Sequence, residues 1–245
     1  MRAVVLHQHG DIENLKFHEN YRDPKCEENQ VIIRVKATSL NYHDVFTTRG
    51  MPGIKVPMPI IIGLDIAGKI EELGKKVEGW KVGDSVLVNP LDPVTPEKGL
   101  MGEMLDGGTA EYCAVDSTRL IKIPEGCSYE QAAALPVAYG TAHRMMRGNG
   151  RMKGGEKVLI LGASGGVGSC CVLLAKMMEC EVVAAGSSPQ KLNALKNWGA
   201  DHVIGYENFD KQIFEIYGKP HRRKYEGGVD VTINFTGGDT WVPSL

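Results

Sequence analysis

The sequence has little that would place the protein at a membrane or on nucleic acid. No apolar stretch among the 245 residues approaches the length of a membrane span, and the N-terminus has no apolar segment typical of a signal peptide. The formal net charge is −2, which gives no basic field to attract nucleic acid. One short basic run, 221–224, lies between glycines and predicts a solvated loop. We therefore expect a cytoplasmic globular protein whose partner is a small molecule, with no nucleic-acid or membrane partner.

Disulfide and metal-ligating patterns are also missing. The six cysteines are scattered along the chain, and none forms a Cys-x-x-Cys pair. This spacing argues against a disulfide framework and against a structural zinc site. Cys170 and Cys171 fall in a predicted helix, where we expect them to act as small apolar side chains.

What the sequence does contain is a glycine-rich turn, 162–168, between an apolar strand and an apolar helix. This order is the opening of a dinucleotide-binding unit, and a purely structural turn is the alternative. We expect Gly165 and Gly166 to supply the dihedral angles of the turn and to let the backbone approach a pyrophosphate, while Gly168 lets the helix pack close to the strand. The predicted cofactor contacts here are Ala163, which replaces the usual first glycine, Gly165, Gly166, Val167 and Gly168.

The end of the second strand of this unit, 181–186, indicates which dinucleotide binds. An NAD site normally has Asp or Glu at this point, to bind the ribose hydroxyls. This chain has no carboxylate there, and instead offers the hydroxyls of Ser187 and Ser188 and the ammonium of Lys191, which suit a 2′-phosphate. We therefore predict NADPH. The alternative interpretation is that Ser188 only caps the next helix and that Lys191 is a solvated charge.

The remaining pattern predicts an α/β protein in two parts. Short strands separated by turns suggest a compact, barrel-like β domain in the first part, at 1–6, 30–37, 60–62, 66–73, 84–88 and 110–115. A helical pattern follows at 129–147, and a connector at 147–155. Strands and helices then alternate, as in a parallel sheet. The predicted strands are 158–161, 181–185, 200–205 and 229–234, and the predicted helices are 166–178, 189–198 and 209–217.

Several motifs in both parts together resemble one family. They are Ala37–Asp44, Gly63–Gly68, Gly83–Val86, Gly107–Tyr112, Ala132–Pro136, Gly165–Gly168 and Gly199–Ile204. Over nearly the whole chain they resemble the medium-chain dehydrogenase/reductase superfamily, in its zinc-independent quinone oxidoreductase branch. The resemblance implies a GroES-like β-barrel catalytic domain at 1–147 without its C-terminal return, and a Rossmann domain with a doubly wound parallel sheet at 148–245.

The predicted sheet has four strands, whereas the complete Rossmann sheet has six. We therefore expect either a product truncated in its C-terminal half or an unusually short member of the family. In many relatives the part that would be missing carries the dimer-forming edge, so the resemblance implies a homodimer for the full-length form.

The resemblance also implies residues for the cofactor site. Asn41 and Thr141 would lie near the nicotinamide. The adenosine 2′-phosphate would be surrounded by Gly186, Ser187, Lys191 and Tyr206. The substrate would lie in the cleft between the two domains.

Zinc members of the superfamily carry Cys where this chain has Asn41 and His where it has Leu64, and the segment 89–106 lacks their four-cysteine lobe. Leucine cannot bind a metal, so we predict no catalytic zinc. Without a Lewis acid, alcohol oxidation is disfavoured. Addition of hydride to a quinone or to a conjugated C=C–C=O group is easier, because such a substrate is already an electron sink.

The candidate catalytic residues are Asn41, Tyr42 and His43. A proton must reach the reduced substrate, and Tyr42 and His43 are the nearest groups that could supply it, unless they only shape the pocket. Asp44 and Asp65 are expected either to orient ligands or to make buried hydrogen bonds.

Three functions follow as hypotheses. The first is NADPH-dependent reduction of a quinone or an α,β-unsaturated carbonyl compound. The second is reduction of an enoyl thioester. The third is a catalytically inactive NADPH-binding protein, which would suit a short chain.

Overall fold

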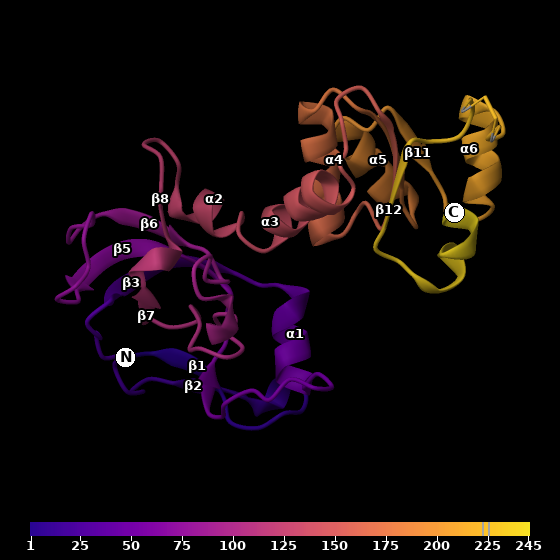
Figure 1. Ribbon diagram of the computed structural model, residues 1–245. Helices are drawn as coiled ribbons and strands as arrows, with labels where there is room; N and C mark the ends of the chain where they lie inside the picture. The colour runs from indigo at the N-terminus through magenta and orange to yellow at the C-terminus, as the bar shows by residue number, and fades with distance from the viewer. Residues whose placement is uncertain (222, 225) are drawn as a thin grey trace. The chain divides into compact units, whose positions relative to one another are not determined.

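The computed structural model describes residues 1–221, 223, 224 and 226–245, and the chain forms two compact units, Met1–Val137 and Ala138–Leu245 (Figure 1). Arg222, in the predicted basic loop, lies outside the described residues. The division falls ten residues before the boundary expected at 147. The reason is that the helix α3, Ala138–His143, packs against α4, Gly166–Met177, and contributes Ala142 to the core of the second unit.

Antiparallel strands dominate the first unit. Its strands are β1 (Ala3–Leu6), β2 (Leu15–His18), β3 (Gln30–Ser39), β4 (Ile60–Ile61), β5 (Asp65–Leu73), β6 (Ser85–Val88), β7 (Tyr112–Asp116) and β8 (Leu120–Lys122). In the described residues they form one sheet in the order β2-β1-β4 and another in the order β7-β3-β5-β6-β8. The alternating apolar residues of β3, such as Val31 and Ile33, pack with Ile66 and Ile70 of β5 in the main core of this unit.

The pairing of β3 with β5 positions the chemistry of this unit. Ser39, the last residue of β3, lies opposite Asp65, the first residue of β5. The helix α1 (Tyr42–Arg49) begins three residues after Ser39, so its N-terminus lies next to Asp65. It ends at Gly50, whose positive φ of 89° suits glycine.

Two helical segments differ from the prediction. No helix was expected at α1, which has β-branched Thr47 and Thr48 in a short segment without an apolar stripe. The helical pattern expected at 129–147 is divided into α2 (Tyr129–Ala133), α3, and one π-helical turn at Arg144–Asn149. The break falls at Pro136, which has no N–H to donate and pushes the preceding residue out of helical geometry.

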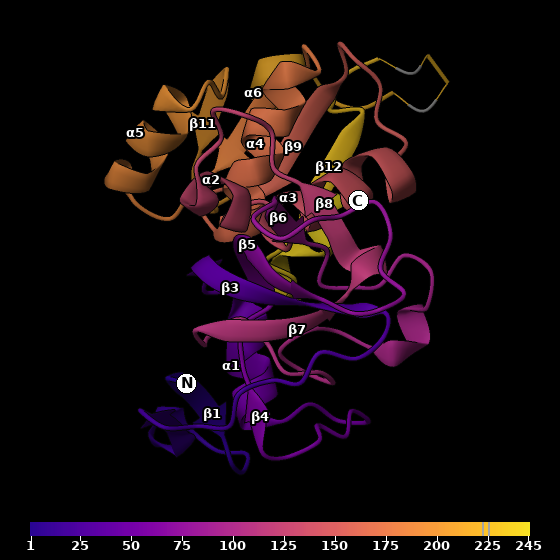
Figure 2. The ribbon, with the colours of Figure 1, turned by 90° about the vertical axis from the view of Figure 1, so that its left-hand side faces the viewer.

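The second unit is a parallel sheet in the order β11-β10-β9-β12, covered on both faces by helices (Figure 2). Its remaining elements are β9 (Lys157–Leu161), β10 (Glu181–Ala185), α5 (Pro189–Asn197), β11 (His202–Ile204), α6 (Phe209–Tyr217) and β12 (Val231–Asn234). All of them were predicted, to within three residues at either end. Val158 and Ile160 of β9 face α3 and α4, whereas Leu159 and Leu161 face α6. In the described part of the chain no helix is both long and apolar enough to cross a membrane.

Candidate active site

The N-terminus of α1 is organised by a buried carboxylate. The Asp65 side chain is buried, at 1% exposure, and accepts hydrogen bonds from Asn41 Nδ2 at 2.8 Å and from Val137 N at 3.0 Å. It also accepts one from the hydroxyl of Ser39. Burial raises the pKa of Asp65, and the hydrogen bonds from Asn41 and Ser39 oppose that rise. Asn41 is therefore held in one orientation by a residue from the neighbouring strand.

A second carboxylate fixes the start of the helix itself. Asn41 is the N-cap residue of α1, and its backbone N–H donates to Asp44 Oδ2 at 2.7 Å. Asp44 is buried, and burial raises its pKa, while the hydrogen bond from Asn41 and the nearby imidazole of His43 act in the opposite direction. This local bonding explains why a segment of weak helix propensity forms a helix here.

His43, on the first turn of α1, is paired with a residue from a distant loop. Its Nε2 lies 2.6 Å from Oε2 of Glu103, and the side chains are 26% and 7% exposed. Tyr42 is largely exposed and packs edge-on against Phe46, with ring centroids 5.0 Å apart. Of the three candidate catalytic residues, His43 and Asn41 are thus held by carboxylates, whereas Tyr42 is held only by a ring contact.

A groove of about 360 Å³ runs beside this helix end. Its walls are mainly apolar, with Asn41 and Asp44 as polar groups at the helix. The lining residues are Gly10, Asp11, Ile12, Leu15, Leu40, Asn41, Asp44, Val45, Thr48, Arg49 and Ile62. An apolar hollow with a few convergent polar groups is the usual form of a small-molecule site.

The prediction of no catalytic zinc rests on Leu64 and Asn41 at this end of α1. Leu64, where zinc members carry a histidine, is buried at 2% exposure, and Asn41 is bonded to Asp65. Among the residues that the structure describes, no group of three or more His, Cys, Asp or Glu side chains could hold a metal ion. The side chains here suit hydrogen bonding and proton transfer better than metal binding.

The glycine turn of the second unit connects β9 to α4. The positive φ expected of Gly165 and Gly166 is found instead at Gly162, whose φ is 81°, because Gly165 is extended and Gly166 already belongs to the helix. Gly168 behaves as predicted, since a Cβ there would lie 2.2 Å from the carbonyl oxygen of Gly162. A Cβ at Gly166 would meet no protein atom within 4 Å.

The start of α4 is therefore open to a ligand. Gly165 is its N-cap residue and makes no side-chain cap, so the first amides of the helix have no intrahelical acceptor. Such amides, with the helix dipole behind them, attract a phosphate. The methyl group of Ala163 is buried in the core, so only its backbone could contact a cofactor. Val167 is partly buried against the same core.

The polar residues at the end of β10 are compatible both with a helix cap and with a 2′-phosphate site. Ser188 Oγ accepts from Lys191 N at 3.4 Å and caps α5, as the structural alternative predicts. Lys191 Nζ donates to Ser187 Oγ at 3.2 Å, which gathers a hydroxyl and an ammonium at the predicted 2′-phosphate position next to the buried Gly186. Tyr206 lies between this corner and the turn, because its hydroxyl accepts from Gly162 N at 2.9 Å.

Thr141 is exposed on α3, which packs against α4. Within the second unit, hydrogen bonds join Lys191 to Ser187 at the end of β10 and Tyr206 to the glycine turn.

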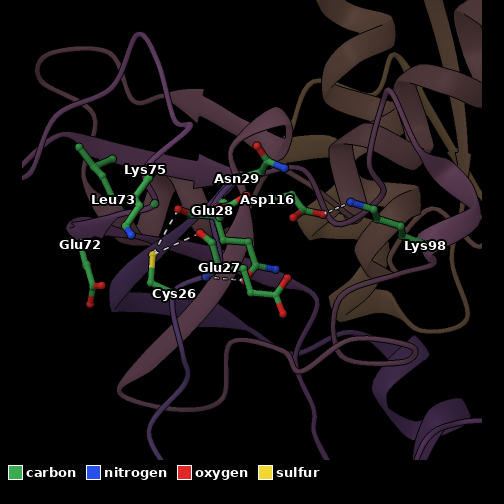
Figure 3. A pocket seen from close by; sticks show the side chains of 11 residues that line it. Cys26, Glu27, Glu28, Asn29, Glu72, Leu73, Lys75, Lys98 and Asp116 are labelled. Carbon is green, nitrogen blue, oxygen red and sulfur yellow. Dashed lines mark hydrogen bonds and ion pairs between the residues drawn. The ribbon is translucent and has the colours of Figure 1, made fainter.

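A larger hollow of about 670 Å³ lies elsewhere in the first unit (Figure 3). Charged side chains line it, including the ion pair of Lys98 with Asp116 at 2.8 Å. Its cysteine, Cys26, is unsuited to nucleophilic chemistry, because burial and the nearby Glu72 raise the pKa of the thiol. We therefore place the candidate active site at α1 and not at this larger hollow.

Glu103 and Ser39 were missed as site residues. Glu103 lies sixty residues from His43 in a segment that the sequence presents only as a polar loop, so no local pattern could have identified it. Ser39 belongs to the motif 37–44, whose alternation predicts a strand end but not a bond to Asp65.

Comparisons with known proteins show the family of the chain. The family model described as the alcohol dehydrogenase GroES-like domain matches residues 27–125, and the one described as zinc-binding dehydrogenase matches residues 166–245. Acryloyl-coenzyme A reductase of Sulfurisphaera tokodaii is 33% identical over 259 residues, which cover 100% of this chain and 73% of that protein. The chain belongs to the medium-chain dehydrogenase/reductase superfamily.

Other similar proteins include a reductase, an alcohol dehydrogenase and a quinone oxidoreductase. The 2-methylene-furan-3-one reductase of Solanum lycopersicum is 37% identical over 214 residues, covering 86% of this chain and 54% of that protein, so the chain spans about half of its length. A solved NAD-dependent alcohol dehydrogenase has a TM-score of 0.89 at 29% identity, over 100% of this chain and 73% of its own. The quinone oxidoreductase of Thermus thermophilus, solved also with NADPH, has a TM-score of 0.77 at 28% identity, over 98% and 68%. The predicted superfamily, and the antiparallel and parallel parts of the fold, are confirmed.

Proposed function

We propose that this chain catalyses NADPH-dependent reduction of a quinone or an α,β-unsaturated carbonyl compound, without zinc. The observation that carries the proposal is the end of α1, where Asn41 and His43 are each bonded to a buried carboxylate and Leu64 stands at the position of a metal ligand. Such a site can hydrogen-bond a carbonyl and move a proton, but it offers little to make an alkoxide from an alcohol.

The second unit supports NADPH as the cofactor. The open start of α4 fits a pyrophosphate, since a Cβ at Gly166 would occupy the space that the phosphate needs. Ser187 and Lys191 fit a 2′-phosphate, and no carboxylate at the end of β10 would repel it. When bound, NADPH supplies the hydride.

The residues of the first unit bind and protonate the substrate. Asn41 gives one amide proton to Asp65 and offers its other polar positions to a carbonyl group or to the cofactor's carboxamide. The groove beside Asn41 offers mainly apolar walls to the carbon skeleton of the substrate, while His43 and Tyr42 are not among the residues that line it. His43 holds a proton for the α-carbon of the enolate, or for the oxygen of a reduced quinone. Tyr42, exposed next to it, is the alternative donor.

An enoyl thioester is the second candidate substrate. The relative described as acryloyl-coenzyme A reductase favours it, because an acryloyl thioester has the same conjugated C=C–C=O group as an enone. The two substrates differ in what lies beyond the carbonyl carbon, and both require the same hydride and proton additions.

The test measures binding and turnover separately. Fluorescence titration with NADPH should saturate, and NADPH oxidation should proceed with a panel of quinones, enones and enoyl thioesters. Activity should survive removal of bound metal by a chelator. If NADPH binds but no panel member is reduced, the chain would instead be a catalytically inactive NADPH-binding protein. Activity that needs stoichiometric zinc would contradict the metal-free mechanism.

A further inference from the structure

Glu103 is an unusual residue to bury. Its side chain is only 7% exposed, and in the described part of the chain its carboxylate makes one hydrogen bond, to His43 Nε2 at 2.6 Å. Burying a carboxylate is costly unless a partner compensates for the lost hydration. The contact with the His43 imidazole therefore has to compensate for the lost hydration of the Glu103 carboxylate.

The turn that carries Glu103 is held firmly in place. Gly102 N donates to the carbonyl of Leu105 at 2.7 Å, and a Cβ at Gly102, where φ is 71°, would lie 2.7 Å from Gly63 N. Gly108 N donates to the carbonyl of Gly63 at 2.9 Å. The turn is thus packed against the segment that leads into β5, and the carboxylate is presented to α1 at a fixed position.

We propose that Glu103 is the residue that positions His43 for proton transfer, an inference that rests on the proposed reductase function. Because a carboxylate only accepts, the nitrogen that faces it is Nε2–H, and the transferable proton of the imidazolium is on Nδ1. Besides Glu103, the groups that face the ring are the carboxyl of Asp44 and the edge of Phe46, whose ring centroid lies 6.4 Å away. Neither of them is hydrogen-bonded to Nδ1 in the structure.

The proton and electron balance is simple. Bound NADPH would supply a hydride to the β-carbon of the conjugated substrate and be oxidised to NADP⁺, which would leave the substrate as an enolate. The enolate takes the proton from Nδ1–H of His43, and a C–H bond forms at the α-carbon. Glu103 keeps the Nε2 proton in place throughout, so the ring returns to its neutral form with a free Nδ1, which water protonates again.

The test uses two variants of one position and a matched control. Glu103→Met removes the acceptor at similar length, Glu103→Gln retains an oxygen acceptor, and Glu111→Gln removes a comparable pair, with Arg2 at 2.8 Å, away from α1. We expect Glu103→Met to lower kcat by about 10- to 100-fold, and the KM for NADPH to stay within about twofold. Glu103→Gln should recover most of kcat, and Glu111→Gln should lose none.

A double-mutant cycle separates positioning from a structural role. If Glu103 acts only through the imidazole, adding Glu103→Met to His43→Ala should change kcat by less than about twofold. Losses that multiply in the double variant would overturn the proposal. So would a Glu103→Met kcat equal to that of the Glu111→Gln control.

A spectroscopic readout keeps the inference independent of turnover. In the ¹⁵N–¹H spectrum of the chain without cofactor, the neutral His43 ring should carry its proton on Nε2, with a downfield signal that exchanges slowly with water. Glu103→Met should abolish that signal, and Glu111→Gln should preserve it. If the wild type reduces no panel member, the proposed function fails, but this signal still decides the contact. A signal that survives in Glu103→Met overturns it.

Discussion

The proposed cofactor site at the start of α4 and the proposed substrate site at the start of α1 are built in different ways. At the start of α4 the groups proposed to face the ligand are backbone amides, and the space for the ligand depends on glycines that have no side chain. At the start of α1 the groups are side chains, Asn41 and His43, each held by a carboxylate from elsewhere in the chain. A backbone site depends on local sequence, whereas a side-chain site depends on contacts between distant segments. The two sites should therefore fail differently when they are mutated.

The largest effect is expected at the glycine turn. In Gly168→Ala the new Cβ would lie 2.2 Å from the carbonyl oxygen of Gly162, so backbone must move. We expect a loss of about 3 kcal/mol in the free energy of unfolding of the second unit, as for other overpacked positions. Urea unfolding followed by Trp198 and Trp241, with Trp80 replaced by Phe, measures it.

Gly166→Ala is the matched control, because its Cβ meets no protein atom within 4 Å. This variant should fold as stably as the wild type but bind NADPH at least about tenfold more weakly, since the methyl group would occupy the pyrophosphate space. Wild-type affinity in Gly166→Ala would show that the phosphate does not lie there.

Asn41→Ala tests the side-chain site at the start of α1. It removes the amide that Asp65 holds, and kcat should fall by about 10- to 100-fold, equivalent to about 1.4 to 2.7 kcal/mol in activation free energy. Most contacts to NADPH are expected from the second unit, so NADPH binding should weaken by a smaller factor than kcat falls, even where Asn41 contacts the carboxamide. Steady-state kinetics and fluorescence titration on the same preparations separate the two effects. A weakened NADPH affinity with unchanged kcat would reverse the assignment.

Lys191 tests the choice of cofactor. Its Nζ lies 3.2 Å from Ser187 Oγ at the predicted 2′-phosphate position. Lys191→Ala should lower the ratio of kcat/KM for NADPH to that for NADH by about tenfold, as expected for the loss of one charge-assisted contact. Lys196→Ala, which removes an exposed charge from the last turn of the same helix, should leave the ratio unchanged. Equal ratios in the two lysine variants would make Lys191 a solvated charge only.

Sequence reasoning succeeded where structure is local. The strands and α-helices from β9 to β12 were all predicted, because buried parallel strands are continuous apolar runs and glycine marks the turn between 161 and 166. It was less successful at the first unit. The helix α1 owes its formation to bonds made by Asn41 and Asp44 and not to periodicity, and Glu103 reaches His43 only through the folded turn at 100–105. Pro136 was a visible helix breaker that outweighed the run of alanines before it.

The smallest expected effect is a pH dependence at Asp65. Burial raises its pKa, so the folded state favours the neutral acid more than the unfolded state does. Its contribution to stability is therefore greatest below its ordinary value of about 3.9 and is lost as the pH rises through the higher value of the folded state. The free energy of unfolding of Asp65→Asn relative to the wild type should then rise as the pH increases above about 4.

Urea unfolding followed by Trp80, with Trp198 and Trp241 replaced by Phe, isolates this effect in the first unit. Glu111→Gln should show the opposite pH dependence, because the hydrogen bonds from Arg2 lower the pKa of the Glu111 carboxyl. The free energy of unfolding of the wild type should therefore increase relative to that of Glu111→Gln as the pH rises. A difference for Asp65→Asn that is flat with pH, or that follows the direction of Glu111→Gln, would mean that Asp65 is already compensated as a charge. Asn41 would then be held by an ordinary ionised carboxylate.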